Sequence, residues 1–318
     1  MEFGISTLTR GLYTSRGTYM AIAQAAERAG FSFLSVNDHM IVPAKLGSAY
    51  PYTQGGVWSA AEHGHCFDQL ATLAFIAGCT TRLKLLTSVM VVPHRPVIQT
   101  AKTLSTIDVL SNGRLVLGVG AGWMEEEFRL LGAPFKERGA VTDEYIEAFK
   151  ELWTAERPSY EGKHVSFKDL IFSPKPVQAG GPPIWVGGES PAALRRTAKL
   201  GDAWYPGNNN QQMPMDTPAR LEAGMAKMHR AAEKAGRDPA TIAMGIIVQN
   251  PFDWTRQETQ DKSARRMFTG SSDEMRADRA ALDAVGVKHV ALRLGGESVT
   301  ESIDRIHRFG EEVIAKAT

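Results

Sequence analysis

The chain repeats one pattern eight times: a short apolar segment ends in polar or glycine residues and, in most cases, is followed by helical spacing. Strands that alternate with helices are typical of parallel sheets, because a parallel connection needs a crossover. Eight such units favour an α/β fold closed into a (β/α)8 TIM barrel over an open, doubly wound sheet. The segments are Glu2–Ser6, Ser32–Val36, Leu83–Ser88, Leu115–Val119, Ile184–Val186, Ala203–Tyr205, Ala243–Val248 and His289–Leu294.

The pattern predicts a single domain over residues 1–318, since barrels commonly reach this length. One region interrupts the rhythm. Residues from about 155 to 183 are rich in proline and glycine, with apolar Val165 and Phe167 in alternation. This composition predicts an inserted hairpin or arm.

Composition narrows the function classes. The 36 basic and 35 acidic side chains leave a formal net charge of +1, so we predict neither a nucleic-acid nor a membrane partner. Cys66 and Cys79 do not make a disulfide framework. With no apolar core for a signal peptide in MEFGISTLTRG and no run near ~18 apolar residues, we expect a cytoplasmic protein.

The polar or small residues that end the predicted strands are expected to meet on one rim of the barrel. Catalytic sites of such barrels lie on the carboxyl rim, so this clustering predicts an enzyme with a small-molecule substrate. The residues are Asp38-His39, Ser88, Gly120-Ala121-Gly122, Gly187-Gly188-Glu189-Ser190, Tyr205, Asn250 and Arg293.

Asp38 and His39 are the predicted catalytic pair. They follow the apolar strand around Phe33–Val36, where a carboxylate beside an imidazole can polarise, orient or protonate a bound molecule. We expect Asp38 to fix the tautomer of His39. The alternative is structural: Asp38 caps a turn, and His39 bonds to a backbone carbonyl.

Gly187–Ser190 predicts a phosphate site. Two glycines allow a ligand close to the backbone, and the next helix offers free N–H groups at its positive end. A plain strand-to-helix turn is the alternative. Gly118-x-Gly120-x-Gly122 lacks the spacing of a dinucleotide fingerprint, so we interpret these glycines as room for a planar ring or its phosphate tail.

Two polar stretches are interpreted as loops. Glu62, His63, His65 and Cys66 have metal-ligand chemistry, but their spacing matches no structural zinc pattern, so we predict no metal. Asn208–Gln212 predicts a mobile polar loop.

The chain contains DVLSNGRLVLGVGAGWMEEEF at 108–128, DH at 38–39 and TSVMVVPHRPV at 87–97. These motifs resemble the bacterial luciferase-like flavin- or F420-dependent oxidoreductases. The resemblance implies a (β/α)8 barrel with an inserted arm and a flavin or deazaflavin at the carboxyl rim. Asp-His after the second strand is similar to the branch that uses the deazaflavin coenzyme F420.

The resemblance also implies where the cofactor binds. The phosphate-bearing tail is expected at Gly187, Gly188, Glu189 and Ser190. The ring is expected beside Ser88, Val89, Gly120, Ala121, Gly122 and Trp123, with a non-prolyl cis peptide at Ser88–Val89. Sugar-phosphate dehydrogenases of this family carry a glutamate where this chain has Trp123, which suggests a flatter, more apolar substrate.

The resulting hypothesis is an oxidoreductase that transfers a hydride between F420 and a small organic substrate, as a homodimer. An FMN-dependent monooxygenase that uses reduced flavin and O2 is the main alternative. A non-catalytic flavin-binding protein and a zinc hydrolase built on His63–Cys66 are more distant ones.

Overall fold

Eight parallel strands close into a barrel in the computed structural model, which describes residues 1–58, 65–259, 262 and 264–316. Each strand pairs with its neighbour in parallel register, and the pairing of β3 with β5 completes the ring. The predicted TIM barrel and all eight predicted strands are confirmed, with small shifts of their ends. The barrel strands are, in order around the ring, β1 (Glu2–Thr7), β2 (Phe33–Val36), β3 (Lys84–Thr87), β5 (Leu115–Gly120), β8 (Ile184–Gly187), β9 (Ala203–Tyr205), β10 (Ala243–Pro251) and β11 (His289–Arg293).

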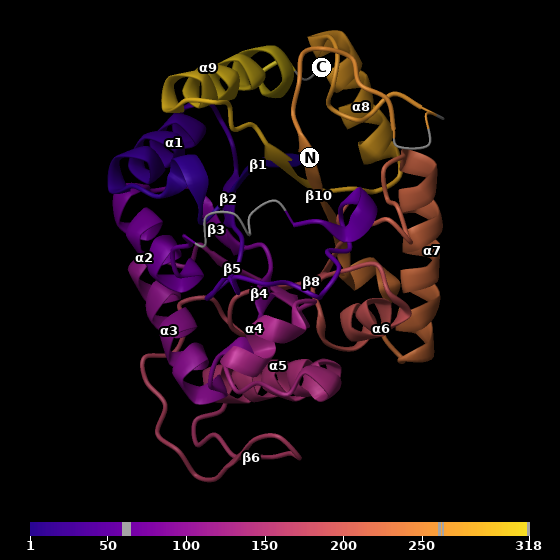
Figure 1. Ribbon diagram of the computed structural model, residues 1–318. Coiled ribbons are helices and arrows are strands. Elements are labelled where there is room, and N and C mark those ends of the chain that lie inside the picture. Colours follow the sequence, from indigo (N-terminus) through magenta and orange to yellow (C-terminus); the bar gives the residue numbers. More distant parts are fainter. Residues whose placement is uncertain (59–64, 260–261, 263, 317–318) are drawn as a thin grey trace.

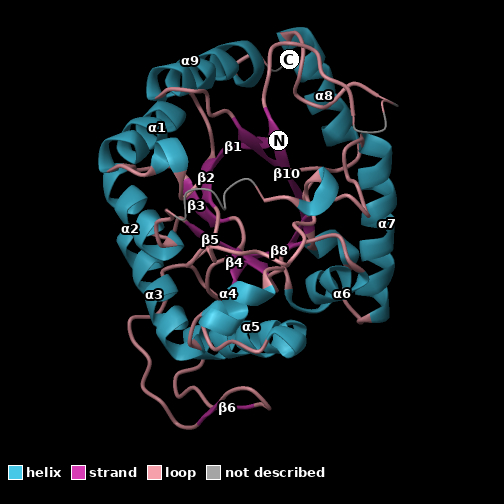
Figure 2. Ribbon diagram, viewed as in Figure 1, coloured by secondary structure: helices cyan, strands magenta, loops and turns pink. Residues whose placement is uncertain are grey.

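Helices form an outer ring around these strands, as Figures 1 and 2 show. One long helix follows each barrel strand, and the short α4 (Glu125–Leu130) lies between β5 and α5. The long helices are α1 (Arg16–Arg28), α2 (Gln69–Cys79), α3 (Val97–Leu110), α5 (Arg138–Thr154), α6 (Pro191–Leu200), α7 (Pro218–Lys234), α8 (Ser272–Ala284) and α9 (Val299–Phe309). Short turns of 3-10 helix cover Gly11–Tyr13, Gln54–Gly56, Val92–His94, Phe135–Glu137 and Pro239–Thr241, and a π-helical turn covers Gly310–Ile314.

Alternation along the strands separates the two cores. In β2, Phe33 belongs to the cluster inside the barrel, whereas Leu34 packs in the large core beneath the helices. The inner cluster consists of Phe33, Leu86, Val116, Trp185, Ala203, Tyr205 and Ala291. Because successive side chains point to opposite faces, each strand fills the barrel with one set and holds a helix with the other.

The predicted arm is present between α5 and β8. It carries the antiparallel pair β6 (Tyr160–Glu161) and β7 (Ser166–Phe167), which Figure 1 shows projecting beyond the helical ring. Its return is fastened by the buried Asp108 of α3. That carboxylate accepts hydrogen bonds from the backbone N–H groups of Val177 and Gln178. Within the described parts of the chain, no helix has the length and apolar character to cross a membrane.

Gly118 in β5 tests how tightly neighbouring strands pack. A Cβ atom there would lie 2.0 Å from the carbonyl oxygen of Thr87 in β3, whereas a Cβ on Gly78 of α2 would meet nothing within 4 Å. We expect Gly118→Ala to lower the free energy of unfolding by about 1–3 kcal/mol, because backbone must move. Gly78→Ala should cause no loss. Denaturant melts of both variants measure this, and equal midpoints would contradict it.

Candidate active site

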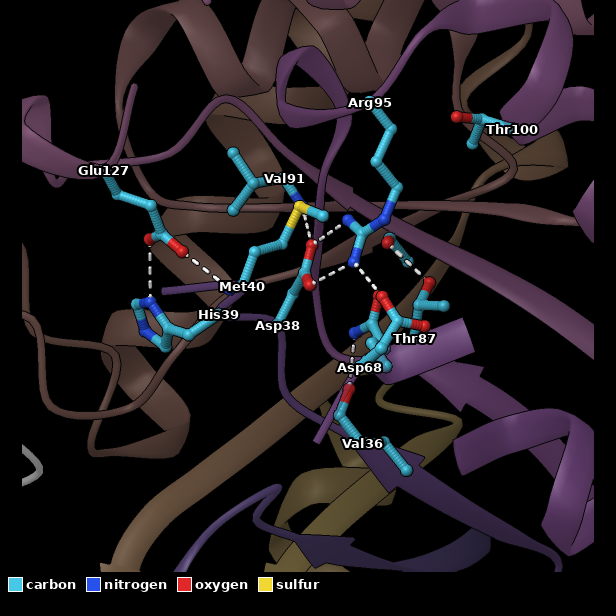
Figure 3. Close-up of polar contacts among 12 residues, drawn as sticks. Val36, Asp38, His39, Met40, Asp68, Thr87, Val91, Arg95, Thr100 and Glu127 are labelled. Atoms are coloured by element: carbon cyan, nitrogen blue, oxygen red, sulfur yellow. Dashed lines mark hydrogen bonds and ion pairs between the residues drawn. The ribbon is translucent and has the colours of Figure 1, made fainter. Parts of the chain in front are cut away.

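Asp38 is buried at the carboxyl end of β2 and is paired with Arg95 (Figure 3). Arg95 donates to both carboxylate oxygens, at 2.7 and 2.8 Å, and the N–H of Val91 donates to one of them at 2.9 Å. Burial opposes ionisation of Asp38, but the guanidinium outweighs it and holds the pKa of Asp38 below its ordinary value. Asp38 is therefore a buried structural anion, and both its oxygens are engaged.

His39 is held by Glu127, not by Asp38. Its Nδ1 lies 2.9 Å from Oε2 of Glu127, whose other oxygen accepts the N–H groups of Met40 and Ile41 at 2.6 and 3.2 Å (Figure 3). Burial raises the pKa of Glu127, but the bond to His39 and these partners leave it lowered, so the carboxylate is ionised. The prediction that Asp38 fixes the tautomer of His39 is wrong, since both its oxygens face Arg95.

The other ring nitrogen of His39 stays available. Among the described residues Nε2 of His39 has no hydrogen-bond partner, and the side chain is 11% exposed. An ionised carboxylate on Nδ1 keeps the proton there and leaves Nε2 as the atom that accepts or donates a proton. The alternative that His39 bonds to a backbone carbonyl is not what the structure shows.

Glu127 and Arg95 are the residues that sequence reasoning missed. Glu127 ends the run Glu125-Glu126-Glu127 at the start of α4, and of these three only Glu127 is buried. Glu127 lies three residues after Met124, which is buried. Because a helix places residues three apart on the same face, this spacing indicated that Glu127 faces inward. Arg95 is a lone cation in an apolar stretch, which pointed to a buried counter-charge.

Aromatic rings surround His39. The ring centre of Trp58 lies 4.3 Å from that of His39, and Trp123 lies 6.2 Å from His39 and 5.9 Å from Trp58. Tyr50 packs against Trp123 at 5.0 Å. Aromatic side chains therefore pack around His39, and the flat substrate that Trp123 suggested stays a prediction.

Val89 fills the space that the glycines leave. The Ser88–Val89 peptide is cis, as predicted, and a short strand β4 (Met90–Val91) follows it. A Cβ on Gly120 would lie 2.7 Å, and one on Gly187 2.9 Å, from methyl carbons of Val89. Val89 therefore fills part of the space beside Gly120 and Gly187, and contact of Gly120 with a cofactor ring stays a prediction.

The neighbouring predicted residues also lie at this edge. Ser88 Oγ lies 3.2 Å from the hydroxyl of Tyr205. Gly122 has φ +84°, and a Cβ there would come within 2.5 Å of the Phe128 ring. Ala121 between the glycines is partly exposed. Their contact with a cofactor ring stays a prediction.

At the end of β8, the predicted phosphate residues have different environments. Gly188 has φ +101°, and Ser190 caps α6 by accepting the N–H of Ala193. Glu189 turns inward and accepts the N–H of Gly207 at 2.6 Å and the amide of Asn210 at 2.7 Å. Burial raises the pKa of Glu189. Its side chain is thus engaged in the protein, and phosphate binding by the backbone here stays a prediction.

The loop at 208–212 is packed rather than free. Asn208 and Asn210 are buried, and Asn208 accepts the N–H of Gln249 at 3.0 Å. The expectation of a mobile loop is therefore wrong. Of the metal-type cluster, Glu62 and His63 lie outside the described residues, and the described ones contain no group of three metal-ligand side chains.

Comparison with known proteins agrees with this architecture. A family model described as luciferase-like monooxygenase matches residues 1–308. The uncharacterized protein Rv0940c of Mycobacterium tuberculosis is 32% identical over 300 residues, covering 94% of this chain and 95% of the relative. The chain belongs to the luciferase-like monooxygenase family, and the predicted enzyme class, a luciferase-like oxidoreductase or monooxygenase, is confirmed.

One further relative and one structural neighbour differ in the cofactor that their names give. The FMNH(2)-dependent dimethylsulfone monooxygenase of Pseudomonas putida is 32% identical over 246 residues, which cover 76% of this chain and 59% of that protein. The coenzyme F420-dependent tetrahydromethanopterin reductase of Methanopyrus kandleri superposes with a TM-score of 0.75, covering 100% and 99% of the two chains. At 16% identity this second likeness concerns the fold alone.

The Asp38–Arg95 pair gives a testable pH dependence. We expect Asp38→Asn to cost about 3 kcal/mol or more at pH 7, because it leaves a buried guanidinium short of its counter-charge. The stability from ionised Asp38 is fully present above its unfolded pKa of about 3.9 and is lost as pH falls through its lower folded value. The deficit of the variant should therefore shrink in acid.

Asp169→Asn is the matched control, because Asp169 pairs with Arg157 on the surface, where both side chains are more than half exposed. Urea unfolding of both variants at neutral and acidic pH measures the difference. Equal losses for the two pairs would contradict the assignment.

Proposed function

We propose that this protein is an oxidoreductase that transfers a hydride between coenzyme F420 and a small organic substrate, with His39 exchanging the accompanying proton. The observation that carries the proposal is the buried His39–Glu127 pair at the carboxyl end of β2, with Nε2 of His39 unpartnered among the described residues. The Asp-His sequence at 38–39, similar to the F420 branch, supports the choice of cofactor.

His39 and Glu127 have separate roles in the proposed reaction. A bound deazaflavin would supply the hydride chemistry at its ring. In the direction of alcohol oxidation, Nε2 of His39 takes the hydroxyl proton while the carbon-bound hydrogen leaves as hydride. In carbonyl reduction the same nitrogen returns the proton. Glu127 stabilises the imidazolium that forms and fixes its orientation, which is the usual role of a carboxylate behind a histidine.

The edge formed by β3, β5 and β8 is compatible with such a cofactor. Glycines at 120, 187 and 188 project no side chains, and the ones at 120 and 187 seat Val89 between the strands. The predicted ring position beside Val89 therefore has a backbone surface with one small apolar side chain. The start of α6, with its Ser190 cap, adds the positive end of a helix for an anionic tail.

An FMN-dependent monooxygenase is the second candidate. The 32% identity to the FMNH(2)-dependent dimethylsulfone monooxygenase favours it. On that alternative His39 would still be the proton donor of the site, so the histidine does not separate the two. Cofactor preference and oxygen uptake do. A homodimeric state, implied by the resemblance, and a cytoplasmic location, expected from the composition, remain predictions.

The cofactor can be identified by titration with F420 and, separately, with FMN. Trp58 and Trp123 lie beside His39, so tryptophan fluorescence should respond to a bound ring. We expect tighter binding of F420 and no oxygen uptake during turnover. Tighter binding of reduced FMN with coupled oxygen consumption would replace the proposal by the monooxygenase.

Substitution of His39 tests the proton transfer. We expect His39→Asn to lower kcat by about 10²–10⁴-fold with F420 affinity retained, since the variant loses the exchangeable proton but not the cofactor edge. Glu127→Gln should lower kcat less and shift the pH profile. Steady-state rates over a panel of alcohols and ketones provide the readout, and full turnover by His39→Asn would eliminate this role.

A further inference from the structure

We propose that the carboxyl rim holds a substrate anion, a carboxylate or sulfonate, between Arg10 and Arg293. The inference rests on the proposed function, because it names the substrate class of that site: a small, flat organic acid. It modifies the expectation of a flatter, more apolar substrate by adding an anionic group. Four observations support it: the placement of the two arginines, their free hydrogen-bond donors, their like charge, and their distance from the predicted phosphate site.

Both arginines lie at the carboxyl end of adjacent strands. Arg293 ends β11, and Arg10 follows β1 three residues after its last residue, Thr7. The two strands pair in parallel, with Ile5 opposite Leu292. Ala291 belongs to the cluster inside the barrel and Leu292 to the outer core, so alternation directs Arg293 to the inner side. The two cations therefore stand side by side at the opening.

Most of their hydrogen-bond donors are unused. In the described parts of the chain Arg10 makes no side-chain hydrogen bond, and its only ring contact is with Trp58, 5.1 Å from the ring centre. Arg293 donates once, to the carbonyl of Gln249 at 3.0 Å. By contrast, the guanidinium of Arg114, also partly buried, donates hydrogen bonds to five acceptors. A guanidinium offers donors in the planar fork that matches a carboxylate.

The two positive charges face each other without a counter-charge. No carboxylate of the described residues lies within ion-pair distance of either arginine, whereas Arg95 and Arg265 each pair with two. Burial and the charge of Arg293 lower the pKa of Arg10. Like charges held together in a partly buried place are stabilised when an anion binds between them.

The anion site lies one aromatic ring away from His39. Trp58 contacts Arg10, and its ring centre lies 4.3 Å from that of His39. Tyr50 continues the wall, with its hydroxyl 3.4 Å from Oε1 of Gln249. An acid held by the arginines would lay its body along Trp58 and place its other end at Nε2 of His39. An aromatic or other flat body suits these walls.

A cofactor anion is the other source of the same chemistry. The predicted phosphate residues Gly187 and Gly188 follow β8, which stands four strands from β1 and three from β11 around the ring. The arginines are thus on the far side of the opening from that site. This arrangement favours the substrate as the source, and the cofactor arm below separates the two.

The test uses benzoate and benzenesulfonate as probes, with benzamide as the neutral analogue, in the full chain with and without saturating F420. Binding is followed by tryptophan fluorescence, since Trp58 contacts Arg10. We expect the anions to bind more tightly than benzamide, and Arg10→Met and Arg293→Met to weaken anion binding at least about tenfold each. Benzamide affinity should not change. Arg10→Lys should retain part of the anion affinity.

Arg129→Met is the control, because it removes an exposed positive charge from α4. Thermal melts of all variants check that they fold. The proposal is overturned if benzoate binds no better than benzamide in the wild type, or if Arg129→Met weakens it as much as the rim variants do. Loss of F420 affinity in the rim variants, with benzoate unaffected, would also overturn it by assigning the arginines to the cofactor.

Failure of this inference is distinguishable from failure of the proposed function. Wild-type affinity for F420 and the rate of His39→Asn decide the function without reference to the arginines. Arginine-dependent binding of benzoate by a protein that prefers FMN would retain the anion site on a monooxygenase.

Discussion

A single guanidinium fixes the part of this barrel that holds the candidate active site. Arg95 binds Asp38 at the end of β2 and also reaches Asp68 at 3.1 Å, while Asp68 itself caps α2 through the N–H of Ala71. The residue after Arg95, Pro96, occupies the N-cap position of α3. One side chain thus ties a strand end to the starts of two helices. A buried pair of this kind contributes little net stability over apolar packing, but breaking it is costly, so it specifies one arrangement.

The Asp38–Arg95 pair also determines the position of His39. It follows Asp38 directly, so the fixed strand end sets its backbone, and Glu127 sets its ring. Two neighbouring carboxylates of α4 then hold the segment 40–58, which carries Tyr50 and Trp58 and crosses the opening toward β10 in Figure 1. Glu126 accepts the N–H groups of Gly47 and Ser48, at 2.6 and 3.0 Å. At the far end Tyr52 bonds to Glu189.

The fold could be predicted from the sequence because its determinants are local. Apolar runs such as Phe33–Val36 and the polar residues after them mark strand and rim without knowledge of distant contacts. The partners of the site are not local: 88 positions separate His39 from Glu127, and 57 separate Asp38 from Arg95. Adjacency suggested that Asp38 serves His39, but neighbouring side chains leave a chain in different directions, and each found a distant partner.

The glycines show the same limit at smaller scale. Their lack of a side chain was visible in the sequence. Which group fills the space beside them depends on the path of another part of the chain, and here Val89 lies in it. The loop at 208–212, in which Asn208 and Asn210 are buried, was mispredicted for a related reason. Its polarity suggested water as the partner, whereas Glu189 and the end of β10 supply the partners from within the protein.

The attachments of the segment 40–58 have a consequence for how such enzymes diverge. Glu126 and Glu127 hold it largely through main-chain N–H groups, at positions 40, 41, 47 and 48. Any residue except proline presents that donor. The anchoring chemistry is therefore indifferent to the side chains it anchors. Side chains of the segment 40–58 can therefore be exchanged during evolution while its backbone stays in place beside His39. A new specificity then does not need a new scaffold.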